Sequence, residues 1–221
     1  MDPCSLFLES KWRIIKEIAR KNQSPAEIAQ KLNTSIANIN QQIKLLEAYG
    51  FLKKEKQVIS KKPGKPKTVY SIAKDIAYVL GINNELAEKK QVKINLDTQF
   101  MINLLLLDLK DEVYFLGKFY FNYEKIFRDA ELVAFYKSDE NNIELFIISE
   151  KLEDLRTKYA NVVIEDLNKK SRKIVLWSHT LTEIEQGLAN KEKHFTDLVK
   201  NSQTISDFNS KGLLTTLKEK V

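Results

Sequence analysis

The sequence contains very little cysteine and histidine, the side chains from which many metal and catalytic sites are built. Its 221 residues include one cysteine, Cys4, and two histidines, His179 and His194. A single cysteine excludes an intrachain disulfide, a cysteine-based zinc site and an iron–sulfur cluster, because each of these needs several thiolates.

Glycine is also scarce, with six in the chain, and no two of them have the spacing of GxGxxG or GxxxxGK[ST]. These motifs bring backbone N–H groups close to a phosphate, which requires glycine. The sequence therefore encodes neither a Rossmann nor a P-loop phosphate site, and most cofactor-dependent enzymes are disfavoured. We expect no cofactor, no metal and no enzymatic activity.

Long hydrophobic runs are missing as well. The longest apolar stretch, FMINLLLLDL at residues 100–109, is interrupted by Asn103 and Asp108. A membrane-spanning helix needs about 20 predominantly apolar residues. The N-terminal residues lack the charged-then-apolar order of a signal peptide. We expect a cytoplasmic protein that does not bind membranes.

What the chain does contain is a folded-protein composition with an uneven distribution of charge. Hydrophobic residues make up 43% and charged residues 30%, and the net charge is +6. Residues 1–72 hold fourteen Lys and Arg against six Asp and Glu, a net +8, so the remainder is −2. This asymmetry is typical of a nucleic-acid-binding module joined to a domain with another role.

Three amphipathic helices are predicted in the first 50 residues. The first covers residues 6–20, and the second starts at a capping box in which Ser24 precedes Pro25 and Glu27 lies three residues later. The third ends at Gly50, a residue suited to a left-handed helix end. Its apolar positions have a 3, 4, 3 spacing that forms one stripe: Ile36, Ile39, Ile43 and Leu46.

Two strand-like segments follow, residues 51–59 and 68–72, and a lysine-rich Pro-Gly turn, SKKPGKPK, separates them. Three helices and a hairpin with a basic tip have the order of a winged helix. The string EIAQKLNTSIANINQQIKLLEAYGFLKKEK, followed by KPGKPKTVYSI, resembles the winged helix-turn-helix regulators of the ArsR and MarR type. The resemblance covers about residues 5–75 and implies a transcriptional regulator that binds duplex DNA.

The candidate DNA-binding residues follow from the apolar stripe of the third helix. If the stripe packs inward, polar side chains turn outward, and Asn and Gln can pair bidentately with adenine edges in the major groove. Lysines of the wing would contact phosphates, which adds affinity but little sequence information. The predicted contacts are Ser35, Asn38, Gln41, Gln42 and Lys44 in the helix, and Lys61, Lys62, Lys65 and Lys67 in the wing.

Residues 73–90 have an intermittent apolar face and are predicted to form a helix, with Gly81 weakening its middle. By the same resemblance, a helix after the wing pairs two protomers, so we expect a homodimer and palindromic DNA sites. An intramolecular linker helix is the alternative. The predicted organisation is a winged helix domain at residues 1–75, a linker or dimerisation helix at 76–90, and a regulatory domain at 91–221.

The remaining two-thirds of the chain alternate strand-like and helix-like segments, which predicts a C-terminal mixed α/β (α+β) domain with a small sheet. An aromatic run at residues 113–128 is expected to pack in the core, although it could also stack single-stranded bases. Residues 100–109 fit either a buried helix or a strand. Strands are predicted at residues 91–96, 131–136, 143–149 and 173–178, and helices at 151–160, 182–200 and 207–218.

The strand order around residues 130–200 resembles a small nucleotidyltransferase fold, but its motifs are degraded. Lys137 and Ser138 stand where that family has Gly-Ser, and Asn142 and Glu144 stand at its two alternating acids. The third strand, KIVLWS, carries no acid. Because one carboxylate cannot hold two Mg²⁺ ions, we expect a domain without catalysis. An unrelated regulatory α/β domain is the alternative.

Together these features predict a DNA-binding transcriptional regulator whose C-terminal domain regulates, oligomerises, or binds a protein partner or a small-molecule effector. Two other functions remain open at this point. One is an active nucleotidyltransferase with a DNA-binding domain, and the other is a winged-helix adaptor that binds protein.

Overall fold

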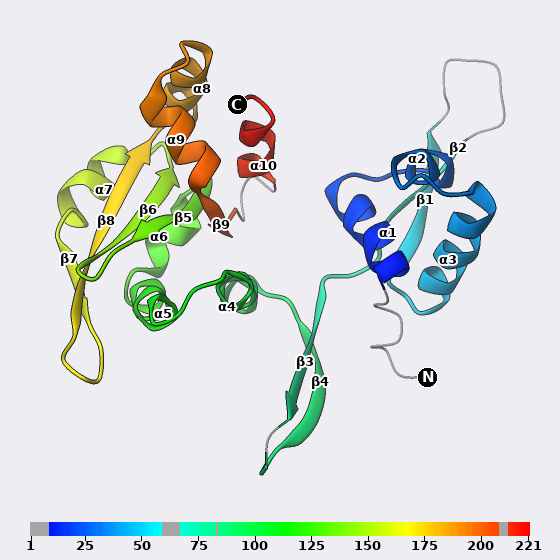
Figure 1. The fold of residues 1–221 in the computed structure, drawn as a ribbon, viewed down its shortest axis with the longest axis horizontal. Helices are drawn as coiled ribbons and strands as arrows, with labels where there is room; N and C mark the ends of the chain where they lie inside the picture. The colour runs from blue at the N-terminus through cyan, green and yellow to red at the C-terminus, as the bar shows by residue number, and fades with distance from the viewer. Residues whose placement is uncertain (1–8, 59–66, 83, 208–211) are drawn as a thin grey trace. The chain divides into compact units, whose positions relative to one another are not determined.

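The structure is a computed structural model that describes residues 9–58, 67–82, 84–207 and 212–221. The chain divides into two compact units, Met1–Lys93 and Ile94–Val221 (Figure 1). Helices and several small sheets occur together, which confirms the predicted mixed α/β class. Within the described ranges, no helix has the length and apolar character needed to cross a bilayer.

The first unit begins with three helices whose ends follow the sequence signals. Ser24 and Glu27 form the predicted capping box, and Gly50 takes the left-handed conformation after the third helix (φ 72°). Of the predicted apolar stripe of the third helix, Ile39, Ile43 and Leu46 are buried with residues of the other two helices, whereas Ile36 is 52% exposed. The elements are α1 (Glu9–Arg20), α2 (Pro25–Lys31) and α3 (Ile36–Ala48).

A β-hairpin follows the helices, at the place where the sequence predicts it. Strands β1 (Leu52–Val58) and β2 (Lys67–Ile72) pair antiparallel. Gln23, in the α1–α2 turn, joins them through two backbone hydrogen bonds with Tyr70, of 3.3 and 2.9 Å. Tyr70 and Leu52 are buried with the helix stripe, so the hairpin is fixed to the three helices by packing as well as by hydrogen bonds.

The predicted helix at residues 76–90 is wrong, because this segment is a second antiparallel hairpin. It consists of β3 (Ile76–Ile82) and β4 (Ala87–Lys93). The physical reason lies in the segment IAYVLGI, where β-branched and aromatic residues favour a strand and Gly81 would weaken a helix by about 1 kcal/mol. The strand predicted at residues 91–96 corresponds to β4, which starts and ends earlier.

The second unit is built on a five-stranded sheet with the order β7-β8-β6-β5-β9. The three strands predicted for its centre are confirmed, and β6 and β8 run parallel, joined through α7 and β7. The short strand β9 was not predicted. The strands are β5 (Leu132–Ser138), β6 (Asn142–Ile148), β7 (Val162–Glu165), β8 (Ser171–His179) and β9 (Gln203–Ser206).

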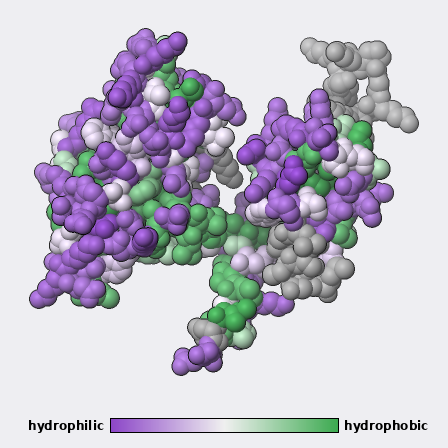
Figure 2. All heavy atoms as spheres, in the orientation of Figure 1, coloured by the Kyte–Doolittle hydropathy of each residue, from purple (hydrophilic) through white to green (hydrophobic). Residues whose placement is uncertain are grey.

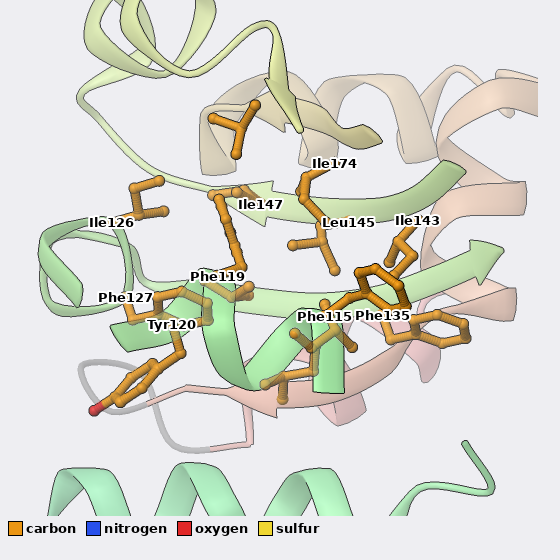
Figure 3. Packing of buried hydrophobic residues seen from close by; sticks show 14 of the residues in the cluster. Phe115, Phe119, Tyr120, Ile126, Phe127, Phe135, Ile143, Leu145, Ile147 and Ile174 are labelled. Carbon is orange, nitrogen blue, oxygen red and sulfur yellow. The ribbon is translucent and has the colours of Figure 1, made fainter. Parts of the chain in front are cut away.

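Helices contribute to separate cores on the two faces of this sheet. One core contains most of the aromatic run: Phe115, Phe119, Tyr120 and Phe127 are buried, which confirms the packing interpretation for these residues, whereas Tyr114 and Phe121 are 39% and 64% exposed. Figure 3 shows side chains of the aromatic run beside Leu145 and Ile147 of β6, with the Tyr120 ring directed away from that strand. Its helices are α4 (Leu96–Leu106), α5 (Glu112–Asn122), α6 (Glu124–Asp129) and α7 (Leu152–Lys158). The helices of the other core are α8 (Leu181–Ala189), α9 (Lys193–Asn201) and α10 (Leu213–Lys218).

The helix predicted at residues 182–200 is interrupted. Thr180 and Glu183 form a capping box at the start of the first helical part, and the chain turns at Lys191, which has a positive φ of 55°. A second helix then starts at a new N-terminus. The last helix begins at residue 213 and not at 207.

A buried ion cluster fixes α5 to the sheet. Arg172 of β8 has a side chain only 6% exposed, and its guanidinium donates to Glu112 Oε1 (3.1 Å) and Asp111 Oδ2 (3.0 Å) at the start of α5. The Ser138 hydroxyl also donates to Glu112. Burial alone would raise the pKa of Glu112, but these bonds and two backbone N–H donors lower it to about 2.

Replacing Arg172 with Ala should lower the free energy of unfolding of the second unit by about 3 kcal/mol, because Glu112 loses its cation while it stays buried. Lys170→Ala is the matched control, since Lys170 pairs with Asp111 at an exposed position, and it should cost less than about 1 kcal/mol. Urea unfolding followed by circular dichroism measures both. Equal losses in the two variants would contradict a buried cluster.

Acid should destabilise the second unit partly through Glu112. Because the folded-state pKa of Glu112 lies below its ordinary value of 4.5, its stabilisation is complete above pH 4.5. It is lost as the pH falls from 4.5 towards about 2. The Glu112→Gln variant should therefore show a shallower loss of stability than the wild type over this range. Glu150→Gln, at an exposed position, should keep the wild-type slope. Parallel slopes for the wild type and Glu112→Gln would be the contrary result.

Candidate nucleic-acid interface

The rotation of α3 about its axis decides which of its polar side chains are available. Ile39, Ile43 and Leu46 are at most 2% exposed. On the opposite side an exposed line runs along the helix at spacings of four, three and four residues. It consists of Ala37, Gln41, Lys44 and Ala48. The end positions of this line carry only methyl groups, and Gln41 and Lys44 lie between them, with the 36% exposed Leu45 at the side of the line.

Two of the predicted contact residues take part in the start of α3. Ser35 is the N-cap, and its hydroxyl accepts a hydrogen bond from the backbone N–H of Asn38 (3.2 Å). The side-chain Nδ2 of Asn38 donates to Thr34 Oγ1 (3.2 Å). Both residues are exposed, but their polar groups already make local bonds that a base contact would have to replace or share.

Gln42 is less available than the other predicted contact residues of α3, and its role as a DNA contact stays a prediction. It lies beside the buried stripe and is half-buried, with its side-chain oxygen Oε1 fully covered. Together with Arg13 and Asn38 it lines a hollow of about 90 Å³ between α1 and α3. No described residue donates a hydrogen bond to Oε1. Position 42 follows Ile39 by three residues, which places it at the edge of the core.

Of the four lysines predicted as wing contacts, only Lys67 lies within the described residues. Lys61, Lys62 and Lys65 lie outside the described residues. Lys67 is the first residue of β2 and pairs with Val58 across the hairpin, so only its backbone position is established. The structure thus supplies the hairpin from which the basic segment extends.

The charges of the first unit are not equally available. Lys31 and Arg20 both form ion pairs with Glu17, at 3.0 and 3.2 Å. The hydrogen bond from Lys31 is the main cause of the lowered pKa of Glu17. Lys54 of β1 pairs with Glu47 (3.4 Å). Lys44 forms no ion pair with any described residue, which leaves its charge available on the exposed line.

One exposed polar residue of α3 was missed. Asn40 lies one helical turn before Lys44, so its amide is on the same side of the helix. The signal was present in the sequence, because the 3, 4, 3 stripe that assigns Gln41 and Lys44 to the outside also assigns Asn40 there.

In the second unit, the one acid retained at the nucleotidyltransferase-like positions is engaged by its neighbours. Glu144 of β6 accepts a hydrogen bond from Trp177 Nε1 (2.6 Å) and pairs with Lys137 Nζ (3.5 Å). Opposite it, the parallel strand β8 carries Val175. Among the described residues, no group of three Asp, Glu, His or Cys is arranged to hold a metal ion.

The chain matches no protein-family model, and no curated protein matches it significantly.

Replacing Gln42 with Leu should keep or raise the stability of the first unit, by up to about 1 kcal/mol, because an amide oxygen buried without a partner is costly. Gln41→Leu makes the same chemical change on the exposed line and should shift stability by less than about 0.5 kcal/mol. Thermal unfolding followed by circular dichroism compares the two. Marked destabilisation by Gln42→Leu would show that its amide makes a bond essential to the fold.

Proposed function

We propose that this protein is a DNA-binding transcriptional regulator that inserts α3 of its first unit into the major groove of duplex DNA. The observation that carries the proposal is the exposed line on α3, where Gln41 and an unpaired Lys44 project between two alanines. A major groove admits one α-helix, and small residues at either end of the line permit close approach to the bases.

The proposed contacts divide by chemistry. The Gln41 amide can accept one hydrogen bond from a base and donate another to it, as in a bidentate pair with adenine. Asn38 and Asn40 lie on either side of Gln41 in the helix. Lys44 and the lysines of the 59–66 segment would neutralise phosphates, so they would strengthen binding to every sequence. The helix carries no arginine, which disfavours the common arginine–guanine contact.

The wider proposal follows from the same interface. Two copies of the chain would bind a palindromic site, and the protein would act in the cytoplasm. The second unit would regulate this binding without catalysing a reaction, through a protein partner or a small-molecule effector. The engagement of Glu144 by Trp177 and Lys137 supports a role other than metal-dependent catalysis.

Duplex binding should be detectable in a mobility-shift titration with genomic DNA fragments, and it should weaken as salt rises. Lys44→Ala should lower affinity for all sequences and reduce the slope of log affinity against log salt by about one, as one lost phosphate contact does. Replacing Lys61, Lys62, Lys65 and Lys67 together should flatten the slope further. Gln41→Ala should mainly reduce sequence preference, by about 1–3 kcal/mol at one position.

The matched control is Lys200→Ala, which removes the same charge from an exposed position on α9 in the second unit. It should leave affinity and salt slope unchanged if the interface is local to the first unit. Folded protein that binds no fragment even at low salt would refute the proposal. Equal losses from Lys200→Ala and Lys44→Ala would show that net charge, and not α3, determines binding.

A further inference from the structure

The β3–β4 hairpin has one charged strand and one uncharged strand. β3 (IAYVLGI) contains no charged residue, whereas β4 (AEKKQVK) contains three lysines and a glutamate. In the described part of the chain, β3 pairs with β4 alone, so the other edge of β3 faces no described strand. Proteins usually protect an exposed edge strand with charges, lysine above all. β4 has this protection and β3 does not.

The uncharged strand is also strongly exposed. Val79, Leu80 and Ile82 are 55%, 58% and 76% exposed. Figure 2 shows hydrophobic surface along this hairpin. The hairpin contacts the rest of the first unit through Tyr78, whose ring centroid lies 6.4 Å from that of Phe51. A two-stranded hairpin is marginally stable in water, and a third strand or a covering element is needed for independent stability.

Pairing between two copies of β3 along their free edges is more favourable than pairing between two copies of β4. β3 has seven residues with Val79 at the midpoint, so antiparallel pairing about Val79 engages the whole strand. It sets Val79 against Val79, Tyr78 against Leu80, and Ile76 against Ile82, with no charge at the junction. The same operation on β4 would set Lys90 against Lys90. Like charges directly opposite each other destabilise a sheet.

We propose that β3 is the dimerisation strand of this protein, and that two copies form a four-stranded sheet in the order β4-β3-β3-β4. The charged β4 strands then lie at the two outer edges, where they oppose further growth of the sheet. The inference deepens the proposed function, which calls for two copies on one DNA site, but the pairing itself requires no DNA. Because the interface is small, the dimer is concentration-dependent.

Sedimentation of the full chain without DNA tests the pairing. The wild type should shift from 25.7 kDa to twice that mass as its concentration rises into the high micromolar range. Val79→Lys should remain monomeric over the same range, because it places a charge at the centre of the edge. Ala87→Lys adds the same charge to β4 and should dimerise like the wild type. Circular dichroism checks that both variants fold.

Disulfide trapping gives a second, covalent readout of the same strand pairing. In a Cys4→Ser background, Val79→Cys should form a covalent dimer on oxidation, because residues opposed across an antiparallel pair have Cβ atoms about 5 Å apart. Lys90→Cys is the matched control, since residue 90 lies opposite Val79 within one hairpin but on the outer strand. It should cross-link far less.

Three results would overturn the inference: a wild type that is monomeric at every concentration, a Val79→Lys variant that still dimerises, or equal cross-linking in the two cysteine variants. Failure of the proposed function is distinguishable from these results. A β3 dimer that binds no DNA would refute DNA binding alone, and a monomer that binds DNA would refute the β3 dimer alone.

Discussion

Burial of one apolar stripe on α3 is the constraint on which the candidate interface depends. Ile39, Ile43 and Leu46 pack against the other two helices, and this packing fixes the rotation of the helix. The rotation in turn determines that Gln41 and Lys44 face outward. The Gln23–Tyr70 bridge joins the β1–β2 hairpin to the same core, so the helix and the base of the wing are held by one packed unit.

The second unit follows a different constraint, a sheet that is covered on both faces. Strand β6 contributes Ile143, Leu145 and Ile147 to one core and Phe146 and Ile148 to the other. Glu144 is the exception on this strand, and its carboxylate is held by Trp177 and Lys137. Because Trp177 belongs to β8 and Lys137 to β5, the Glu144 carboxylate connects β6 to both neighbouring strands.

Much of the fold could be predicted from short-range signals. The capping box at Ser24, the Gly50 helix end and the central strands of the large sheet depend on local chemistry that the sequence displays directly. The aromatic core could be predicted for the same reason, because few basic residues interrupt it. The α1–α2–α3 order and the hairpin followed from apolar spacing and turn residues.

Other features depend on contacts that local patterns do not contain. Residues 76–82 have apolar positions that suit a helix or a strand, and pairing with β4 decides the outcome. Gln42 looks like its neighbour Gln41 in the sequence, and only the contact of α3 with α1 separates a half-buried amide from an exposed one. The Arg172 cluster joins residues about 60 positions apart, a distance at which no motif could connect them.

The central claim is that α3 is the DNA-reading element, and a nuclear magnetic resonance titration of the full ¹⁵N-labelled chain with duplex DNA tests it most directly. The account predicts that side-chain and backbone signals of Asn40, Gln41 and Lys44 change together as the duplex is added. The half-buried side-chain amide of Gln42 should change much less. A bound duplex that leaves the α3 signals in place, and shifts signals of the second unit instead, would contradict the account.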